Sequence, residues 1–109
     1  PDYLGFAQSA EAVSFSSNAA TATVGKFAHY CTSSSSGTDI LTLGNGSTGQ
    51  VKYIVLVSDG GANARVTPSG TFTGGSYVQL DSAGDSVQML YTGSTYGWVV
   101  LGGNSYTIA

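Results

Sequence analysis

His29, the only histidine of the chain, has the widest chemical repertoire of any residue in it. An imidazole can act as a general base, activate a nucleophile or bind a metal ion. His29 lies in a predicted strand, residues 26–32, where it shares a face with Phe27 and Cys31. No carboxylate lies nearby in the sequence to orient the ring, so we interpret His29 as part of a half-buried sheet. One alternative stays open, in which three copies of His29 meet near a trimer axis and bind a metal or an anion.

The acidic residues are the other candidates for catalysis, because glycosidases use two carboxylates that face one cleft. They are scattered singly at predicted turns and termini: Asp2, Glu11, Asp39, Asp59, Asp81 and Asp85. Asp59 and Asp85 each lie beside a glycine in a predicted turn, where an Asp side chain can bond its own backbone. Calcium at residues 59–63 is more plausible than a carboxylate pair, although this segment lacks the oxygen ligands of a dedicated calcium loop. We therefore expect a protein that is not an enzyme and has no cofactor.

Residues 44–49, with the sequence GNGSTG, match the glycine pattern of a dinucleotide-binding loop. That mechanism requires a helix directly afterwards, because the N–H groups at its N-terminus hold the pyrophosphate. The following residues, 50–55, alternate as a strand does. We therefore predict a hairpin turn around Asn45 and Gly46 in place of a cofactor loop.

Side chains suited to ligand binding gather in two predicted surface segments. Tyr96 and Thr95 lie in the turn 92–96, and Ser34 and Ser35 lie in the polar run 32–38, which we predict to be a flexible loop. Tyr combined with Ser, Gly and Asn gives binding surfaces rigid contacts and adaptable hydrogen bonds, and aromatic faces suit a sugar ring. These four residues are the candidate ligand contacts.

Composition limits the classes of function. The chain has 109 residues, the length of one domain, and only 8% of them are charged. The net charge is −3 and the basic residues are Lys26, Lys52 and Arg65, which gives no electrostatic footprint for nucleic acid. No apolar run approaches the roughly 20 residues that span a bilayer, so we expect no membrane insertion. Because the chain starts at Pro1, we expect residues 1–109 to be a single domain from a longer protein.

Short alternating segments separated by turn formers predict an all-β fold. The ten predicted strands are residues 12–16, 21–24, 26–32, 40–43, 50–58, 64–67, 76–80, 86–91, 97–101 and 106–108. Helix content should be near zero. This series predicts an antiparallel β-sandwich or a jelly-roll-like domain.

Two of these segments carry further information. In residues 50–58, Val51, Tyr53, Val55 and Val57 fall on one face while Ile54 and Leu56 fall on the other. Since no helices are expected to cover the second face, that face needs another sheet or another subunit, and we favour a subunit interface. Residues 86–91 and 97–101 predict a hairpin, in which Asp85 is a turn residue and Trp98 anchors the core.

An ordered series of motifs resembles a pattern in the C-terminal regions of tailed-phage fibres and other virus structural proteins. The series comprises residues 43–54, 59–63, 66–68, 84–87 and 97–98, and it extends over about sixty of the 109 residues. The resemblance implies a β-rich domain that trimerises at the tip of a fibre or spike and contacts the host surface. It implies no catalytic residues, and the first forty residues lie outside it.

The first hypothesis is therefore a non-enzymatic fibre or spike tip domain on the virion surface, a homotrimer that binds a host-cell glycan or protein. A purely structural trimerisation or capsid-decoration domain is an alternative. A carbohydrate-binding module of a carbohydrate-active enzyme is another. These alternatives differ in oligomeric state, in binding to host cells and in binding to glycans.

Overall fold

The structure is a computed structural model, and it describes residues 10–109 of the chain. This part consists of strands and connections, as the alternating pattern predicts, and contains no helix that could cross a membrane. The ten strands are β1 (Ala10–Ser14), β2 (Ala19–Thr21), β3 (Ala28–Thr32), β4 (Thr38–Leu43), β5 (Val51–Ser58), β6 (Asn63–Pro68), β7 (Val78–Leu80), β8 (Ser86–Tyr91), β9 (Trp98–Asn104) and β10 (Thr107–Ile108). Every predicted strand overlaps one of them, and β8 has the predicted bounds.

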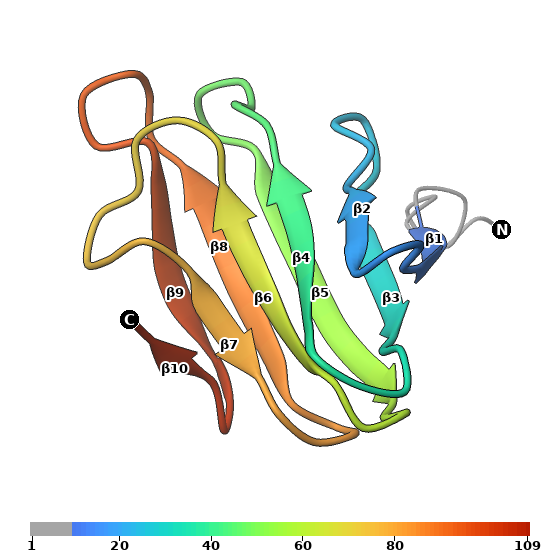
Figure 1. Cartoon of the computed structure of the whole chain (residues 1–109). Helices are drawn as coiled ribbons and strands as arrows, with labels where there is room; N and C mark the ends of the chain where they lie inside the picture. Colours follow the sequence, from blue (N-terminus) through green and yellow to red (C-terminus); the bar gives the residue numbers. More distant parts are fainter. Residues whose placement is uncertain (1–9) are drawn as a thin grey trace, which may run out of the picture.

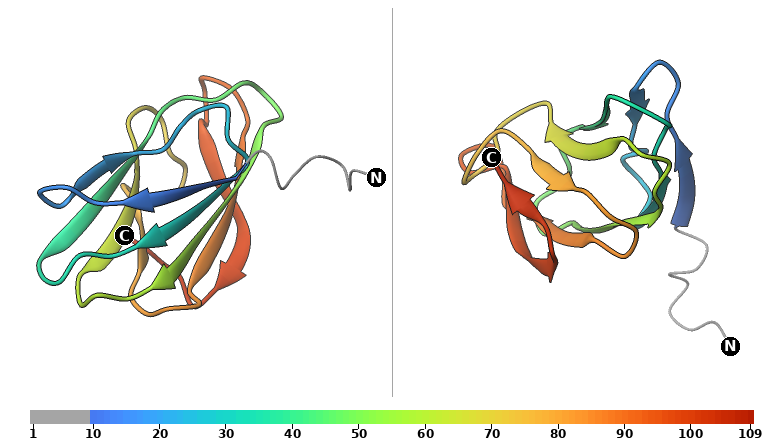
Figure 2. Two further views of the ribbon diagram at one scale, coloured as in Figure 1. Left: turned by 90° about the vertical axis from the view of Figure 1, so that its right-hand side faces the viewer. Right: turned by 60° about the horizontal axis from the view of Figure 1, so that its bottom comes forward.

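The strands form two five-stranded sheets that face each other (Figures 1 and 2). Sheet I has the order β1-β3-β5-β8-β9, and sheet II has the order β10-β7-β6-β4-β2. An all-β architecture consistent with a β-sandwich is therefore confirmed. In the orientation of Figure 1, sheet II lies in front of sheet I.

The sheets are mixed, where an antiparallel, jelly-roll-like arrangement was expected. The first six strands alternate between the two sheets, so that β1, β3 and β5 pair in parallel in sheet I, and β2, β4 and β6 do so in sheet II. Parallel neighbours need a crossover between them, and here each crossover is a strand of the opposite sheet. The four later strands, β7 to β10, add only antiparallel pairs: β6 with β7, β7 with β10, β5 with β8 and β8 with β9. Turn residues mark where a strand ends, but they do not say which sheet the chain enters next.

Two predicted hairpins have opposite outcomes. The connection that contains Asn45 and Gly46 leads from β4 in sheet II to β5 in sheet I, so the hairpin predicted there is wrong. The pair β8 and β9 does form an antiparallel hairpin. Asp85 also has its predicted role, because its carboxylate accepts hydrogen bonds from the backbone N–H groups of Asp81 and Ser82, each at 3.0 Å.

The core lies between the sheets and is built from the inward residues of alternating strands. Trp98 is fully buried, packs edge-to-face on Tyr91 with 5.2 Å between ring centroids, and donates its indole N–H to the carbonyl of Gly44 at 3.0 Å. The predicted role of Trp98 as a core anchor is confirmed. Ile54 and Leu56 of β5 are also fully buried, as the two-faced pattern of that strand requires.

Candidate functional site

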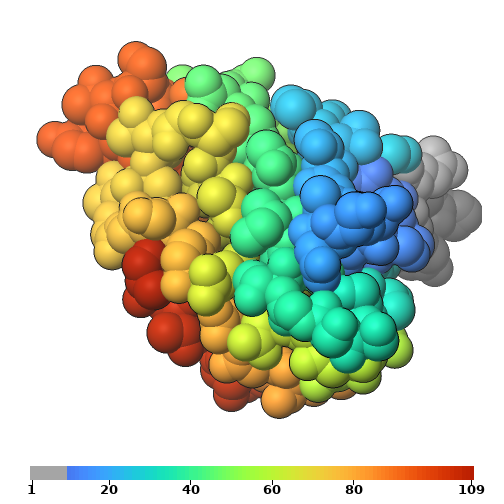
Figure 3. Space-filling model, in the orientation of Figure 1, coloured from blue at the N-terminus to red at the C-terminus, as the bar shows by residue number. Residues whose placement is uncertain are grey.

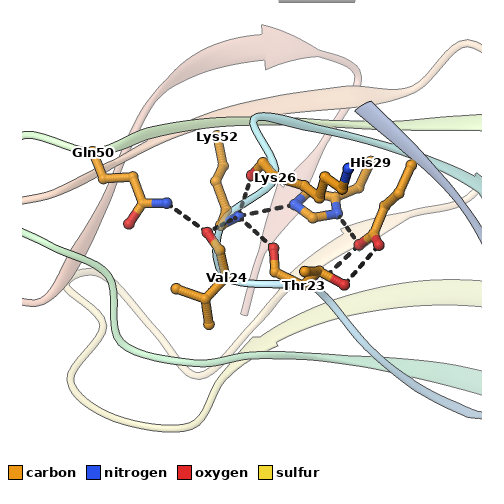
Figure 4. Close-up of polar contacts among 7 residues, drawn as sticks. Thr23, Val24, Lys26, His29, Gln50 and Lys52 are labelled. Atoms are coloured by element: carbon orange, nitrogen blue, oxygen red, sulfur yellow. Dashed lines mark hydrogen bonds and ion pairs between the residues drawn. The ribbon is translucent and has the colours of Figure 1, made fainter. Parts of the chain in front are cut away.

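A cluster of ionisable side chains lies inside the molecule, between sheet I and the connection from β2 to β3. Lys52 of β5 and His29 of β3 are both fully buried, and the Lys52 Nζ lies 3.0 Å from the His29 Nε2 (Figure 4). The ammonium nitrogen also lies within hydrogen-bond distance of the carbonyl oxygens of Thr23 at 3.1 Å and Val24 at 3.0 Å, and of that of Lys26, so its three N–H groups are shared among four acceptors. Lys52 therefore ties this connection to the centre of sheet I.

Glu11 of β1 completes this cluster on the other side of the imidazole. Its Oε2 lies 2.6 Å from the His29 Nδ1, and its carboxylate accepts hydrogen bonds from the Thr23 hydroxyl at 2.7 Å and the Thr23 N–H at 2.9 Å. These partners assign the tautomer of His29: Nδ1 carries the proton and donates to Glu11, while Nε2 accepts from Lys52. The imidazole is then neutral, and both of its ring nitrogens are engaged in hydrogen bonds.

The pKa shifts agree with this assignment. Burial, and then the charge of Lys52, lower the pKa of His29 from its ordinary value, despite the opposing effect of Glu11. Burial also lowers the pKa of Lys52. For Glu11, burial raises the pKa, but the hydrogen bonds from Thr23 and His29 together outweigh it and leave the pKa lowered. The cluster is thus a carboxylate and an ammonium joined through a neutral ring.

This cluster is built to hold strands together. Among residues 10–109, no buried side-chain nitrogen or oxygen lacks a hydrogen-bond partner, and no three metal-ligating side chains gather. The arrangement leaves His29 no nitrogen for a metal at a shared trimer axis. Phe27 was expected on the same face as His29, but its ring packs on Tyr53, on the outer side of sheet I, with 4.7 Å between centroids.

Sequence reasoning missed the partnership of Glu11 and His29, because the two residues are 18 positions apart. The parallel register of β1 and β3 places them directly opposite each other. Had the parallel pairing been known, the alternation of both strands would have put their side chains on the same inner face. The carboxylate that orients the histidine therefore comes from a neighbouring strand.

The predicted serine contacts belong to a loop that is fixed to the body of the molecule. Asp39 is fully buried and accepts hydrogen bonds from the N–H and hydroxyl of Ser34, both at 2.7 Å, and from the Asn18 amide at 2.8 Å. These bonds lower the pKa of Asp39 even though burial, the largest effect, raises it. Ser34 is therefore half-buried and engaged, while Ser35 is exposed. The hydroxyl of Ser34 has a structural role in place of the flexible surface position that was expected.

The other predicted contacts, Tyr96 and Thr95, lie in the exposed turn between β8 and β9. Tyr96 is the most exposed large apolar side chain among the described residues, at 63%, and its carbonyl accepts a hydrogen bond from the Thr73 hydroxyl at 2.8 Å. This turn and the 33–37 loop lie at opposite ends of the molecule (Figure 1). The four predicted contacts therefore do not form one site.

The outer face of sheet I is a broad apolar surface. Tyr30 of β3 is 43% exposed, Val57 of β5 is 48% exposed and Leu101 of β9 is 54% exposed. Register places Tyr30 beside Val55, and Leu90 beside Val99. Around them, the outward side chains of sheet I within residues 10–109 are uncharged, and they include Ala12, Ser14, Thr32, Val51, Tyr53, Ser86 and Gln88. A surface of this kind is typical of contacts with another protein.

The outer face of sheet II is polar, and it is the surface visible in Figure 3. Its outward residues on the three central strands are half-buried: Thr38, Ile40 and Thr42 of β4, Asn63, Arg65 and Thr67 of β6, and Gln79 of β7. Arg65 is the only charged residue in this set. The two sheets are alike in construction, but their outer faces carry different kinds of side chain.

No family model matches the chain, and no curated protein matches it. The contrast between the two outer faces is the feature on which we base a function.

Proposed function

We propose that this chain is a non-enzymatic surface domain of a virus particle, at the tip of a fibre or spike, which assembles with copies of itself and contacts the host surface. The observation that carries the proposal is the apolar, uncharged outer face of sheet I. The resemblance of residues 43–98 to fibre tip domains supports a virion-surface location and a homotrimer. The partner in contact with the host would be a surface glycan or a protein.

The chemistry of the outer face of sheet I favours a second copy of the chain as its partner. Around a threefold axis, a face without charged side chains can pack against the same face of two further copies without burying an unpaired ion, which would cost several kcal/mol. Tyr30, Val57 and Leu101 are about half exposed, and burying such side chains removes apolar area from water at roughly 25 cal/mol per Å². An interface between copies would therefore stabilise residues that the single domain leaves in water.

The size of the molecule is sufficient for such an interface. The described chain extends 37 by 35 Å in its two longer directions. A standard interface buries about 800 Å² on each partner, and one broad face of this molecule can supply that area. Only 8% of the chain is charged, so a large share of its surface is compatible with association.

Sedimentation velocity on the purified domain at micromolar concentration tests this proposal. We expect a trimer for the wild type and a monomer for Tyr30→Lys and Val57→Lys, because each introduces a cation that association would bury. Thr67→Lys, on the outer face of sheet II, is the matched control and should remain trimeric. Circular dichroism verifies that each variant is folded. A stable wild-type monomer at this concentration would contradict the proposal.

Binding of the labelled domain to a panel of candidate host cells separates the proposed function from its alternatives. A trimer that binds cells is the expected result. A trimer that binds no cell would indicate a purely structural trimerisation or decoration domain, and a monomer that binds glycans would indicate a carbohydrate-binding module.

A further inference from the structure

Arg65 on the outer face of sheet II is held in a single orientation by its neighbours. Its Nε donates to the Gln79 Oε1 at 3.0 Å, and its guanidinium lies over the ring of Tyr77, with 4.3 Å between Cζ and the ring centroid. The Gln79 amide is itself fixed, because its Nε2 donates to the Asp81 carboxylate at 2.8 Å and this leaves its oxygen for Arg65. A long cationic side chain has thus lost most of its freedom before any ligand arrives.

The guanidinium retains unused donors. It has five N–H groups, and the bond to Gln79 engages only the one on Nε. The two terminal nitrogens have no hydrogen-bond partner among residues 10–109. A planar pair of N–H donors matches the two oxygens of a carboxylate, and a donor that is already oriented loses little entropy on binding. Arg65 is therefore prepared for an anion with carboxylate geometry.

The residues around Arg65 are suited to hydroxyl-rich molecules. Register places Arg65 between Ile40 on β4 and Gln79 on β7. The same face carries the hydroxyl and amide groups of Thr38, Thr42, Asn63 and Thr67. Such groups both donate and accept, as sugar hydroxyls do, while Ile40 offers an apolar contact to the C–H groups of a sugar ring.

We propose that the outer face of sheet II binds a carboxylate-bearing sugar of a host-surface glycan, with Arg65 as the group that receives the carboxylate. This proposal names the chemical class of the host ligand and in that respect rests on the function proposed above. A single cation fits one carboxylate better than a polyanion, and the Asp81 carboxylate, which accepts a hydrogen bond from Gln79, would repel a polyanion further. An acidic peptide would find few apolar contacts here besides Ile40, so the surface favours a glycan.

A glycan array tests the proposal, with uronic-acid and sialic-acid glycans each printed beside its methyl ester. The ester removes the negative charge and keeps the rest of the sugar. The samples are the wild type, Arg65→Gln, Arg65→Lys and the control Thr48→Ala, whose exposed side chain lies in the connection between β4 and β5. Tyr96→Ala forms a further arm, because it tests the turn between β8 and β9 as a competing site.

We expect the wild type and Thr48→Ala to retain carboxylated glycans and to bind the esters about 10- to 100-fold more weakly, the effect of losing a charge-assisted hydrogen bond. Arg65→Gln should lose a similar factor, and Arg65→Lys should lose less because it keeps the charge without the planar pair. Circular dichroism verifies the fold of each variant. Equal binding of acid and ester, an undiminished Arg65→Gln, or loss in Tyr96→Ala alone would overturn the proposal.

The array distinguishes the proposed carboxylate site from the general proposal of a domain that contacts the host surface. Binding of neutral glycans in preference to carboxylated ones would exclude the carboxylate site, but contact with a host receptor would stand. Absence of binding to every glycan, with a trimer still present in sedimentation, would remove the sugar site and leave assembly through sheet I untouched.

Discussion

The outer face of sheet I and the outer face of sheet II differ in chemistry although the sheets are alike in construction. Both have five strands, with three parallel strands followed by antiparallel ones. Sheet I turns Tyr30, Val57 and Leu101 outward, whereas sheet II turns Thr38, Arg65 and Gln79 outward. Since the fold requires only that the inner faces be largely apolar, we propose that the contrast between the outer faces reflects what each face contacts. We assign assembly to the first and ligand recognition to the second.

The largest expected effect concerns the core that supports both faces. Trp98→Ala should lower the free energy of unfolding by about 3–5 kcal/mol, because it removes a fully buried ring and leaves a cavity. Urea unfolding monitored by far-ultraviolet circular dichroism measures this change. Both assembly and glycan binding should be lost together under conditions where the variant unfolds. If either face kept its activity in an unfolded variant, that activity would not depend on the sheets.

A fall in pH should destabilise the protein through His29, which lies in β3 of sheet I. The pKa of His29 is held below its ordinary value of 6.5, so below that pH the unfolded chain binds more protons than the folded one. The free energy of unfolding should therefore fall as the pH drops from about 7.5 through 6.5 and below. The lowered pKa of Glu11 extends the same trend below pH 4.5.

Urea unfolding at several pH values between about 7.5 and 5.5 measures this effect. The variant His29→Gln is the control, and its stability should depend much less on pH over this range. A wild-type stability that rises as the pH falls would show that His29 is not held neutral in the folded state.

A smaller effect is expected where Arg65 lies over Tyr77. Tyr77→Leu keeps an apolar side chain but removes the ring face, and it should lower the free energy of unfolding by about 0.5–1 kcal/mol. Thermal unfolding measures this loss. The same variant should weaken binding of carboxylated glycans, because the guanidinium becomes less constrained. Unchanged glycan binding would mean that Tyr77 does not position Arg65.

The smallest effect on stability is expected from making the outer face of sheet I resemble that of sheet II. The double variant Tyr30→Thr and Val57→Thr should change the unfolding free energy of the single domain by less than about 0.5 kcal/mol at each site, since both side chains are about half exposed. It should nevertheless abolish trimer formation in sedimentation velocity. A large loss of stability in the monomeric state would show that this face supports the fold more than the assembly.

The sequence predicts the strands of this protein well because period-two alternation is a local property. β5 shows this most clearly, since the buried Ile54 and Leu56 and the more exposed Val55 and Val57 follow directly from their spacing. Trp98 and Asp85 were likewise predicted from local features. The pairing of the strands is not local, so the crossover after β4 was mistaken for a hairpin at Asn45 and Gly46.

The polar contacts depend on that pairing, and for this reason they were not predictable. Glu11 meets His29 only because β1 and β3 are parallel and in register. Ser34 was expected to be free for a ligand, but the buried Asp39 engages it across the start of β4. Arg65 gave no signal in the sequence, because its partners are distant from it along the chain. Gln79 lies in β7, and Tyr77 directly precedes that strand.

The central claim is that copies of this chain meet through the outer face of sheet I. Methyl signals in nuclear magnetic resonance spectra, recorded with a soluble paramagnetic agent for the wild type and for the variant Tyr30→Lys, test it directly. We predict that the methyl groups of Val57 and Leu101 are protected from the agent in the wild type and accessible in Tyr30→Lys, while the methyl group of Thr67 is accessible in both. Protection of Thr67 with Val57 and Leu101 still accessible would contradict the claim.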